Sequence, residues 1–254
     1  MPLPLWAYPI LFLTGITAGI VDSLAGGGGL IALPVLLMFR LPAPIALGTN
    51  KLQSMFGTAS ATRHYARSGA IDLPACWAGA ISACLGSLVG ALTVQSINAA
   101  FLSRVIPFLM AAIFVYMLVR PTAGTTETKP RFRKRVFYVG AGLTLGFYDG
   151  FFGPGVGSFW TISLILGLGF EFLKATGTTK LMNVASNVAA TALFALGGHV
   201  LWLAGLTMAA GQITGARIGA GIAVKKGSRF VRPLFLTIVG ATLARLIYLA
   251  AHAR

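Results

Sequence analysis

Four long stretches of the chain contain no Asp, Glu, Lys or Arg: residues 1–21, 73–103, 150–170 and 181–216. Charged residues make up only 10% of the sequence, whereas a soluble globular domain carries about 25%. The chain therefore has too few charges to cover a water-exposed surface. Because about 20 apolar residues in a helix cross the ~30 Å hydrocarbon core of a bilayer, the pattern predicts an all-α, polytopic integral membrane protein.

The positive charges lie in short connectors between the apolar stretches. The net charge is +15, and basic residues gather at 129–135 and 223–229. Short basic loops are typical of the cytoplasmic side of membrane proteins, so nucleic-acid binding is not expected. With the connector 122–135 in the cytoplasm, both termini are predicted on the non-cytoplasmic side of a bacterial-type inner membrane.

Ten hydrophobic segments are expected, five on each side of that connector. Residues 1–121 would form a first repeat, 122–135 a basic cytoplasmic linker, and 136–254 a second repeat. The expected segments are 4–21, 29–41, 44–66, 73–95, 101–119, 136–151, 155–170, 174–197, 201–224 and 231–250. Segment 29–41 is too short for a full crossing, so re-entrant or broken helices are predicted in each repeat. Whether the first hairpin of each repeat spans the membrane is left open.

The two halves resemble each other in sequence. GITAGIVDSLAGGGG (15–29) matches GLTLGFYDGFFGPGV (142–156), and GTNKL (48–52) matches GTTKL (177–181) two residues further along. An odd number of crossings per repeat places the second copy upside down. Two inverted repeats with interrupted helices are typical of secondary transporters.

Both copies contain a glycine-rich break beside an aspartate. Backbone that is not helical cannot face lipid, so each break must be buried in protein or line a wet cavity. Glycine runs and helix N-termini can direct several N–H groups at one anion. The expected binding groups here are Gly26, Gly27, Gly28, Gly29, Gly153, Gly155, Gly157 and Ser158. The alternative is that glycines only permit close helix packing, which is the interpretation for Gly86, Gly90, Gly211, Gly215 and Gly219.

Two lysines, Lys51 and Lys180, stand in the matched motifs within apolar helices. A charge near the bilayer centre costs at least about 2.5 kcal/mol on insertion scales, which favours a functional role. Lysines from opposite faces would attract an anion, with hydrogen bonds from Thr49, Asn50, Gln53, Thr178, Thr179 and Asn183. Three alternatives stay open for Asp22 and Asp149. They either pair with the lysines and have no further role, or cap helices or carry a coupling proton.

The motifs DSLAGGGGLIALP…LGTNKLQS and DGFFGPGVGSF…GTTKLMN resemble the sulfite exporter TauE/SafE family, and the resemblance covers nearly the whole chain. It implies a bacterial inner-membrane transporter of small sulfur-containing anions such as sulfite or organosulfonates. The second copy departs from the first by having Pro154 within the break and Thr179 in place of Asn50. The two halves are therefore expected to contribute unequally to the site.

The sequence thus predicts a secondary transporter, an exporter by resemblance, with a midplane site and alternating access. The competing interpretations are a passive anion channel or facilitator and a transporter of a different small anion. An enzyme is not expected, because no Ser/His/Asp set or HExxH sequence occurs. No cofactor or metal is expected. The expected partners are a small anion, the lipid bilayer and a coupling proton, and homo-oligomerisation is left open.

Overall fold

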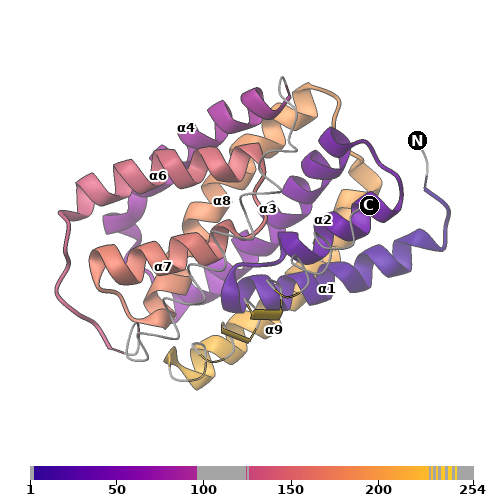
Figure 1. Cartoon of the computed structure of the whole chain (residues 1–254). Helices are drawn as coiled ribbons and strands as arrows, with labels where there is room; N and C mark the ends of the chain where they lie inside the picture. Colours follow the sequence, from indigo (N-terminus) through magenta and orange to yellow (C-terminus); the bar gives the residue numbers. More distant parts are fainter. Residues whose placement is uncertain are drawn as a thin grey trace.

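The computed structural model describes residues 3–95, 124, 126–228, and the single positions 230, 233, 236, 237, 240, 241 and 244. Every regular element in this part of the chain is an α-helix, which confirms the all-α prediction there (Figure 1). The expected segment 101–119 lies outside the described residues, and the expected segment 231–250 lies largely outside them.

The first half contains α1 (Ala7–Ala25), α2 (Gly29–Met38), α3 (Ala43–Arg67) and α4 (Leu73–Val94). The predicted first segment, 4–21, was placed too early, because the helix continues past Asp22. It ends where Gly26 adopts φ +73 and donates its N–H to the Asp22 carbonyl. This left-handed conformation is readily available to glycine and strained for other residues, so Gly26 sets the end of the helix.

The second half contains α6 (Lys134–Phe151), α7 (Val156–Leu168), α8 (Phe172–Leu196) and α9 (Trp202–Lys226). These bounds agree with the expected segments to within two residues. Helices α2 and α7 have 10 and 13 residues, or roughly 15 and 20 Å at the α-helical rise. Each is too short to cross a bilayer, so the predicted break in each half is present.

Two helix pairs are packed backbone to backbone, α1 with α9 and α4 with α6 (Figure 1). A Cβ at Gly215 of α9 would clash with the Ile16 carbonyl of α1, and one at Gly86 of α4 would clash with the Leu143 carbonyl of α6. Gly90, Gly211 and Gly219 make the same kind of contact. Close packing therefore accounts for all five of these glycines.

The two long helices α3 and α8 cross in the middle of the molecule and run antiparallel. Gly48 of α3 lies against Phe194 and His199, at the end of α8 and the loop that follows it. Gly177, the matching glycine of α8, lies against Tyr65 and Ile71, at the end of α3 and the loop that follows it. Matched positions thus make matched contacts in the two halves. Their inversion across a membrane stays a prediction.

Helices α1 and α4 are, within the described ranges, the two that are long and apolar enough to span a membrane by composition. Helices α3, α8 and α9 carry more polar residues, many of them buried between helices rather than on the outside. The outward face of α4 is apolar instead, with Ile81, Leu85 and Val89 each more than half exposed. Apolar side chains outside and polar ones inside are the arrangement that a lipid environment favours.

Candidate functional site

The two glycine breaks lie directly against each other. A Cβ added to Gly26 would clash with the backbone of Gly157, and one added to Gly157 would clash with Gly26. A Cβ on Gly29 would sit 3.4 Å from the Cα of Pro154. The Ser158 hydroxyl donates a 2.7 Å hydrogen bond to the carbonyl of Ala25, which ties the start of α7 to the end of α1. Segments more than a hundred residues apart in the sequence therefore form one junction.

Lys51 reaches the break of the opposite half. Its ammonium group forms a hydrogen-bonded ion pair with the carboxylate of Asp149, near the end of α6. The other carboxylate oxygen of Asp149 accepts a hydrogen bond from the Ser186 hydroxyl of α8. The side chains of Lys51 and Asp149 are only 2% and 3% exposed, so this is a desolvated pair held by helices of both halves.

Lys180 makes the corresponding contact with the first half. Its Nζ lies 3.1 Å from Oδ2 of Asp22 and also donates to the backbone carbonyl of Asp22. The other oxygen, Oδ1, accepts a 3.3 Å hydrogen bond from the N–H of Gly28, at the start of α2. The Lys180 side chain is fully buried, whereas that of Asp22 is 11% exposed. The carboxylate of this pair is therefore slightly more exposed than the carboxylate of the first pair.

The junction does not carry the net positive charge that the two lysines alone would give it. Each lysine is matched by one carboxylate, so the four groups carry no net formal charge. The pairing considered as an alternative for Asp22 and Asp149 is what the structure contains. An anion at this place would therefore have to compete with a carboxylate for each ammonium group.

The breaks also present hydrogen-bonding groups without partners. In the described part of the chain, the backbone N–H groups of Gly27, Gly29, Gly155 and Gly157 form no hydrogen bond. Free N–H groups are normal in the first turn of a helix. Here the backbone before α2 meets the start of α7 in the protein interior, where such groups cost free energy unless water or a ligand satisfies them.

Eight buried side-chain polar atoms in the described residues also lack a hydrogen-bond partner, and three of them bear on the junction. The indole Nε1 of Trp160, Oε1 of Gln53 and Oδ1 of Asn183 are buried without a hydrogen-bond partner. Trp160 lies in α7, one turn beyond the break, and Gln53 and Asn183 lie on α3 and α8 close to their lysines in sequence. Unpaired buried polar atoms of this kind point to an unseen water or ligand.

Two further expected residues join this junction. Asn50 lies next to the first break, since a Cβ on Gly29 would be 3.5 Å from its Nδ2, and its Oδ1 accepts from Gln53 at 2.9 Å. Thr179 lies 3.1 Å from the Thr161 hydroxyl, which itself donates to the carbonyl of Gly157. Asn50 and Thr179 occupy matched positions, and each faces a broken helix of its own half.

Thr49 and Thr178 are directed elsewhere. The Thr49 hydroxyl accepts a 3.0 Å hydrogen bond from the N–H of Leu201, in the loop between α8 and α9. Thr178 lies close to Cys76 of α4. Both are buried, and the Thr178 hydroxyl has no hydrogen-bond partner among the described residues. Nothing in their geometry places them beside the glycine breaks.

Sequence reasoning missed the hydroxyl groups that support the junction. Ser186 holds Asp149, and the hydroxyls of Tyr65 and Tyr148 donate to the carbonyls of Ser23 and Pro154. A signal for Ser186 existed, because it follows Asn183 by one helical turn on the helix that carries Lys180. The tyrosine bonds had no such signal, since they depend on which carbonyls the breaks expose.

Comparison with known proteins agrees with this architecture. Residues 11–246 match the family model described as sulfite exporter TauE/SafE. A probable membrane transporter protein of Haemophilus influenzae is 43% identical over 239 residues, covering 94% of each chain. The probable membrane transporter protein YfcA of Escherichia coli is 38% identical, covering 94% of this chain and 89% of its own. No solved structure matches. The chain belongs to the sulfite exporter TauE/SafE family of membrane transporters.

Proposed function

We propose that this membrane transporter carries small sulfur-containing anions, such as sulfite or organosulfonates, out of the cell by secondary transport. Its binding site would be the junction of the two glycine breaks. The observation that carries the proposal is that two buried lysines, one from each half, reach the two glycine breaks, where several backbone N–H groups have no partner. The family model's description as a sulfite exporter supports the choice of anion.

An oxyanion needs several hydrogen-bond donors to replace its hydration shell. The N–H groups at the starts of α2 and α7 and the Trp160 indole would supply neutral donors. Helix N-termini add partial positive charge at the same place. Lys51 and Lys180 would supply full charges once the anion draws them from their carboxylates. The remaining expected groups, Asn50, Gln53, Thr179, Asn183 and Ser158, would shape the pocket.

The ion pairs suggest how a proton would be coupled to the anion. A protonated Asp22 or Asp149 no longer holds its lysine as a carboxylate does, so the ammonium becomes available to the anion. Proton binding and anion binding would then favour each other, because the proton neutralises the carboxylate that competes with the anion for the lysine. On this proposal the affinity for the anion increases as the pH falls.

Alternating access would follow from movement of one half against the other around the junction. The ion pairs join the halves, since Lys51 and Lys180 each bind an aspartate of the opposite half. Exchanging a carboxylate for the anion would loosen these connections and permit movement. A passive channel is the main alternative, and it would conduct without this coupling between binding and movement.

The test is transport by the purified full-length protein in proteoliposomes, with labelled sulfite, a sulfonate and thiosulfate at several pH values. Removing one lysine would leave a buried unpaired carboxylate, so each pair is neutralised together. The variants are Lys51→Gln with Asp149→Asn, and Lys180→Gln with Asp22→Asn. We expect at least a tenfold loss of transport in each, because the ammonium groups are required for the anion.

The matched control is the exposed ion pair between Lys174 and Glu127, whose Nζ and Oε1 are 2.8 Å apart. Neutralising it with Lys174→Gln and Glu127→Gln should leave transport unchanged. Neutral-pair variants that transport at the original rate with unchanged affinity would reject the assignment of the lysines. Flux without saturation and without counterflow would favour the channel.

A further inference from the structure

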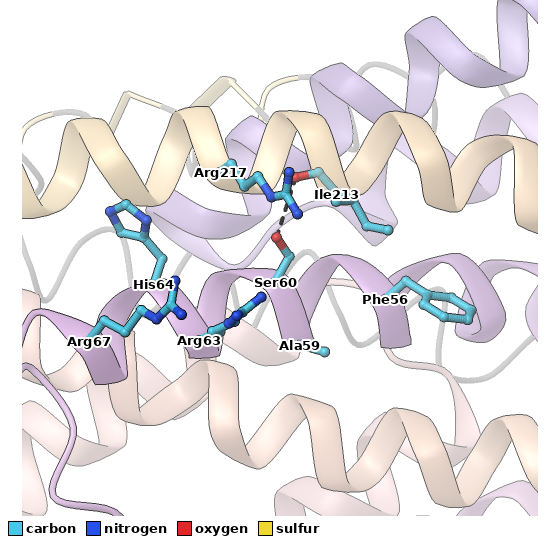
Figure 2. A pocket seen from close by; sticks show the side chains of 8 residues that line it. All are labelled: Phe56, Ala59, Ser60, Arg63, His64, Arg67, Ile213 and Arg217. Atoms are coloured by element: carbon cyan, nitrogen blue, oxygen red, sulfur yellow. Dashed lines mark hydrogen bonds between the residues drawn. The ribbon is translucent and has the colours of Figure 1, made fainter.

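A second charged feature lies away from the junction, in a groove between α3 and α9. The groove has a volume of about 480 Å³ and is lined by Phe56, Ala59, Ser60, Arg63, His64, Arg67, Ile213 and Arg217 (Figure 2). The two helices are in close contact there, as shown by the 3.5 Å hydrogen bond from the Ser60 hydroxyl to the Ile213 carbonyl. This contact between α3 and α9 therefore forms the base of the groove.

One end of the groove is strongly basic. Arg63 and Arg67 are one turn apart on α3, Arg217 faces them from α9, and all three are exposed. His64 lies at the same end, next to Gly221 of α9, whose added Cβ would be 3.8 Å from the His64 ring. The described residues include no carboxylate in an ion pair with any of these groups. Three guanidinium groups without an internal counterion suit a phosphate, which they can bind through paired N–H donors.

The other end of the groove is apolar. Phe56, Ala59 and Ile213 line it, and Figure 2 shows Phe56 at the opposite end of the α3 segment from Arg67. A free anion would use only the basic end. A molecule with a phosphate and a hydrocarbon chain would use both.

The matching positions in the opposite half of the chain carry no charge. With the offset that aligns Lys51 with Lys180, the positions of Arg63, His64, Arg67 and Arg217 correspond to Ala192, Leu193, Leu196 and Leu88. The fold therefore does not need basic residues at these positions for packing. The cluster belongs to one end of the molecule, which the loop charges predict to be the cytoplasmic end.

We propose that this groove binds an anionic phospholipid, with the headgroup phosphate among Arg63, His64, Arg67 and Arg217 and the first part of an acyl chain along Phe56 and Ile213. Basic pockets between transmembrane helices on the cytoplasmic side commonly hold such headgroups. The lipid would hold α3 against α9. Because α3 also carries Lys51, a bound lipid would stabilise the helix that reaches the junction.

The experiment uses the full-length protein in nanodiscs of phosphatidylcholine with increasing cardiolipin. The measurements are the melting temperature and the cardiolipin retained by the purified protein in native mass spectrometry. The groove variant is Arg63→Gln, Arg67→Gln and Arg217→Gln together. The control is Arg131→Gln, Arg133→Gln and Arg135→Gln, which removes the same charge from exposed positions before and within the start of α6.

We expect cardiolipin to raise the melting temperature of the wild type and the control, and the groove variant to retain at least tenfold less lipid. Equal retention by the groove variant would overturn the proposal. An equal loss in the control would overturn it too, because surface charge in general would then explain the binding. Displacement of the lipid by millimolar inorganic phosphate or sulfite would assign the groove to a free anion instead.

Discussion

The two ion pairs at the junction occupy matched positions but differ in how firmly they are held. Asp149 is bound by Lys51 and by the Ser186 hydroxyl, and its side chain is 3% exposed. Asp22 is bound by Lys180 at 3.1 Å and by the N–H of Gly28 at 3.3 Å, and its side chain is 11% exposed. The position that matches Ser186 in the first half is Gly57, which has no side chain to offer.

This difference suggests a division of roles between the halves. The pair of Lys51 and Asp149 is buried from solvent, and both carboxylate oxygens of Asp149 accept a hydrogen bond, as expected of a pair with a structural role. The carboxylate of Asp22 in the pair with Lys180 is more exposed, so it can be replaced or protonated with less disruption. We therefore expect the second pair to exchange first during transport, with the first pair holding the helices in register.

Removing the carboxylate of the tighter pair should have the largest effect on stability. Asp149→Ala leaves the Lys51 ammonium buried without a counterion, which costs about 3–5 kcal/mol. Asp22→Ala should cost less, because Lys180 keeps the Asp22 carbonyl as a partner. The measurement is the free energy of unfolding in detergent by denaturant titration.

The double variant Lys51→Met with Asp149→Leu serves as the control for that prediction. It removes both charges together and should recover most of the stability lost in Asp149→Ala. Equal losses for Asp149→Ala and Asp22→Ala would show that the two pairs are held alike, and the proposed division of roles would fail.

A loss of similar size is expected where the glycine breaks touch. Gly26→Ala forces a side chain into φ +73 and against the backbone of Gly157. Backbone strain of this kind costs about 1–3 kcal/mol, and overpacking adds about 1–3 kcal/mol. Gly198→Ala is the matched control, because Gly198 has φ +71 with nothing within 4 Å of its added Cβ. If both variants lose the same stability in thermal unfolding, steric contact between the two breaks does not contribute to the loss in Gly26→Ala.

The smallest of these effects concerns Ser186. Ser186→Ala removes one hydrogen bond to the Asp149 carboxylate, which is worth about 1.5–3 kcal/mol for a charged acceptor. It would also make the tighter pair resemble the looser one, so the affinity for the anion should change with it. Thr144→Ala, at an exposed hydroxyl of α6, should change neither. An unchanged unfolding free energy in Ser186→Ala would remove the explanation for the asymmetry.

Much of the fold could be predicted because local rules decide it. Uncharged apolar runs set the helices to within a few residues, and the glycine runs beside Asp22 and Asp149 marked the breaks. The spacing by four of Gly86 and Gly90 marked a surface for close packing, which the structure confirms against α6. Residues in the same helix or the same turn determine these features, so neighbouring positions in the sequence are enough to predict them.

The candidate site could be predicted only in part from the sequence. The sequence by itself determined which residues were unusual: two lysines and two aspartates in apolar helices, next to glycine runs. Only the tertiary structure decided that each lysine pairs with the aspartate of the opposite half, that Ser186 supports just one pair, and that Thr49 bonds to the loop before α9. These choices depend on which distant helices meet and how they are rotated, and that is settled by packing the whole set of helices at once.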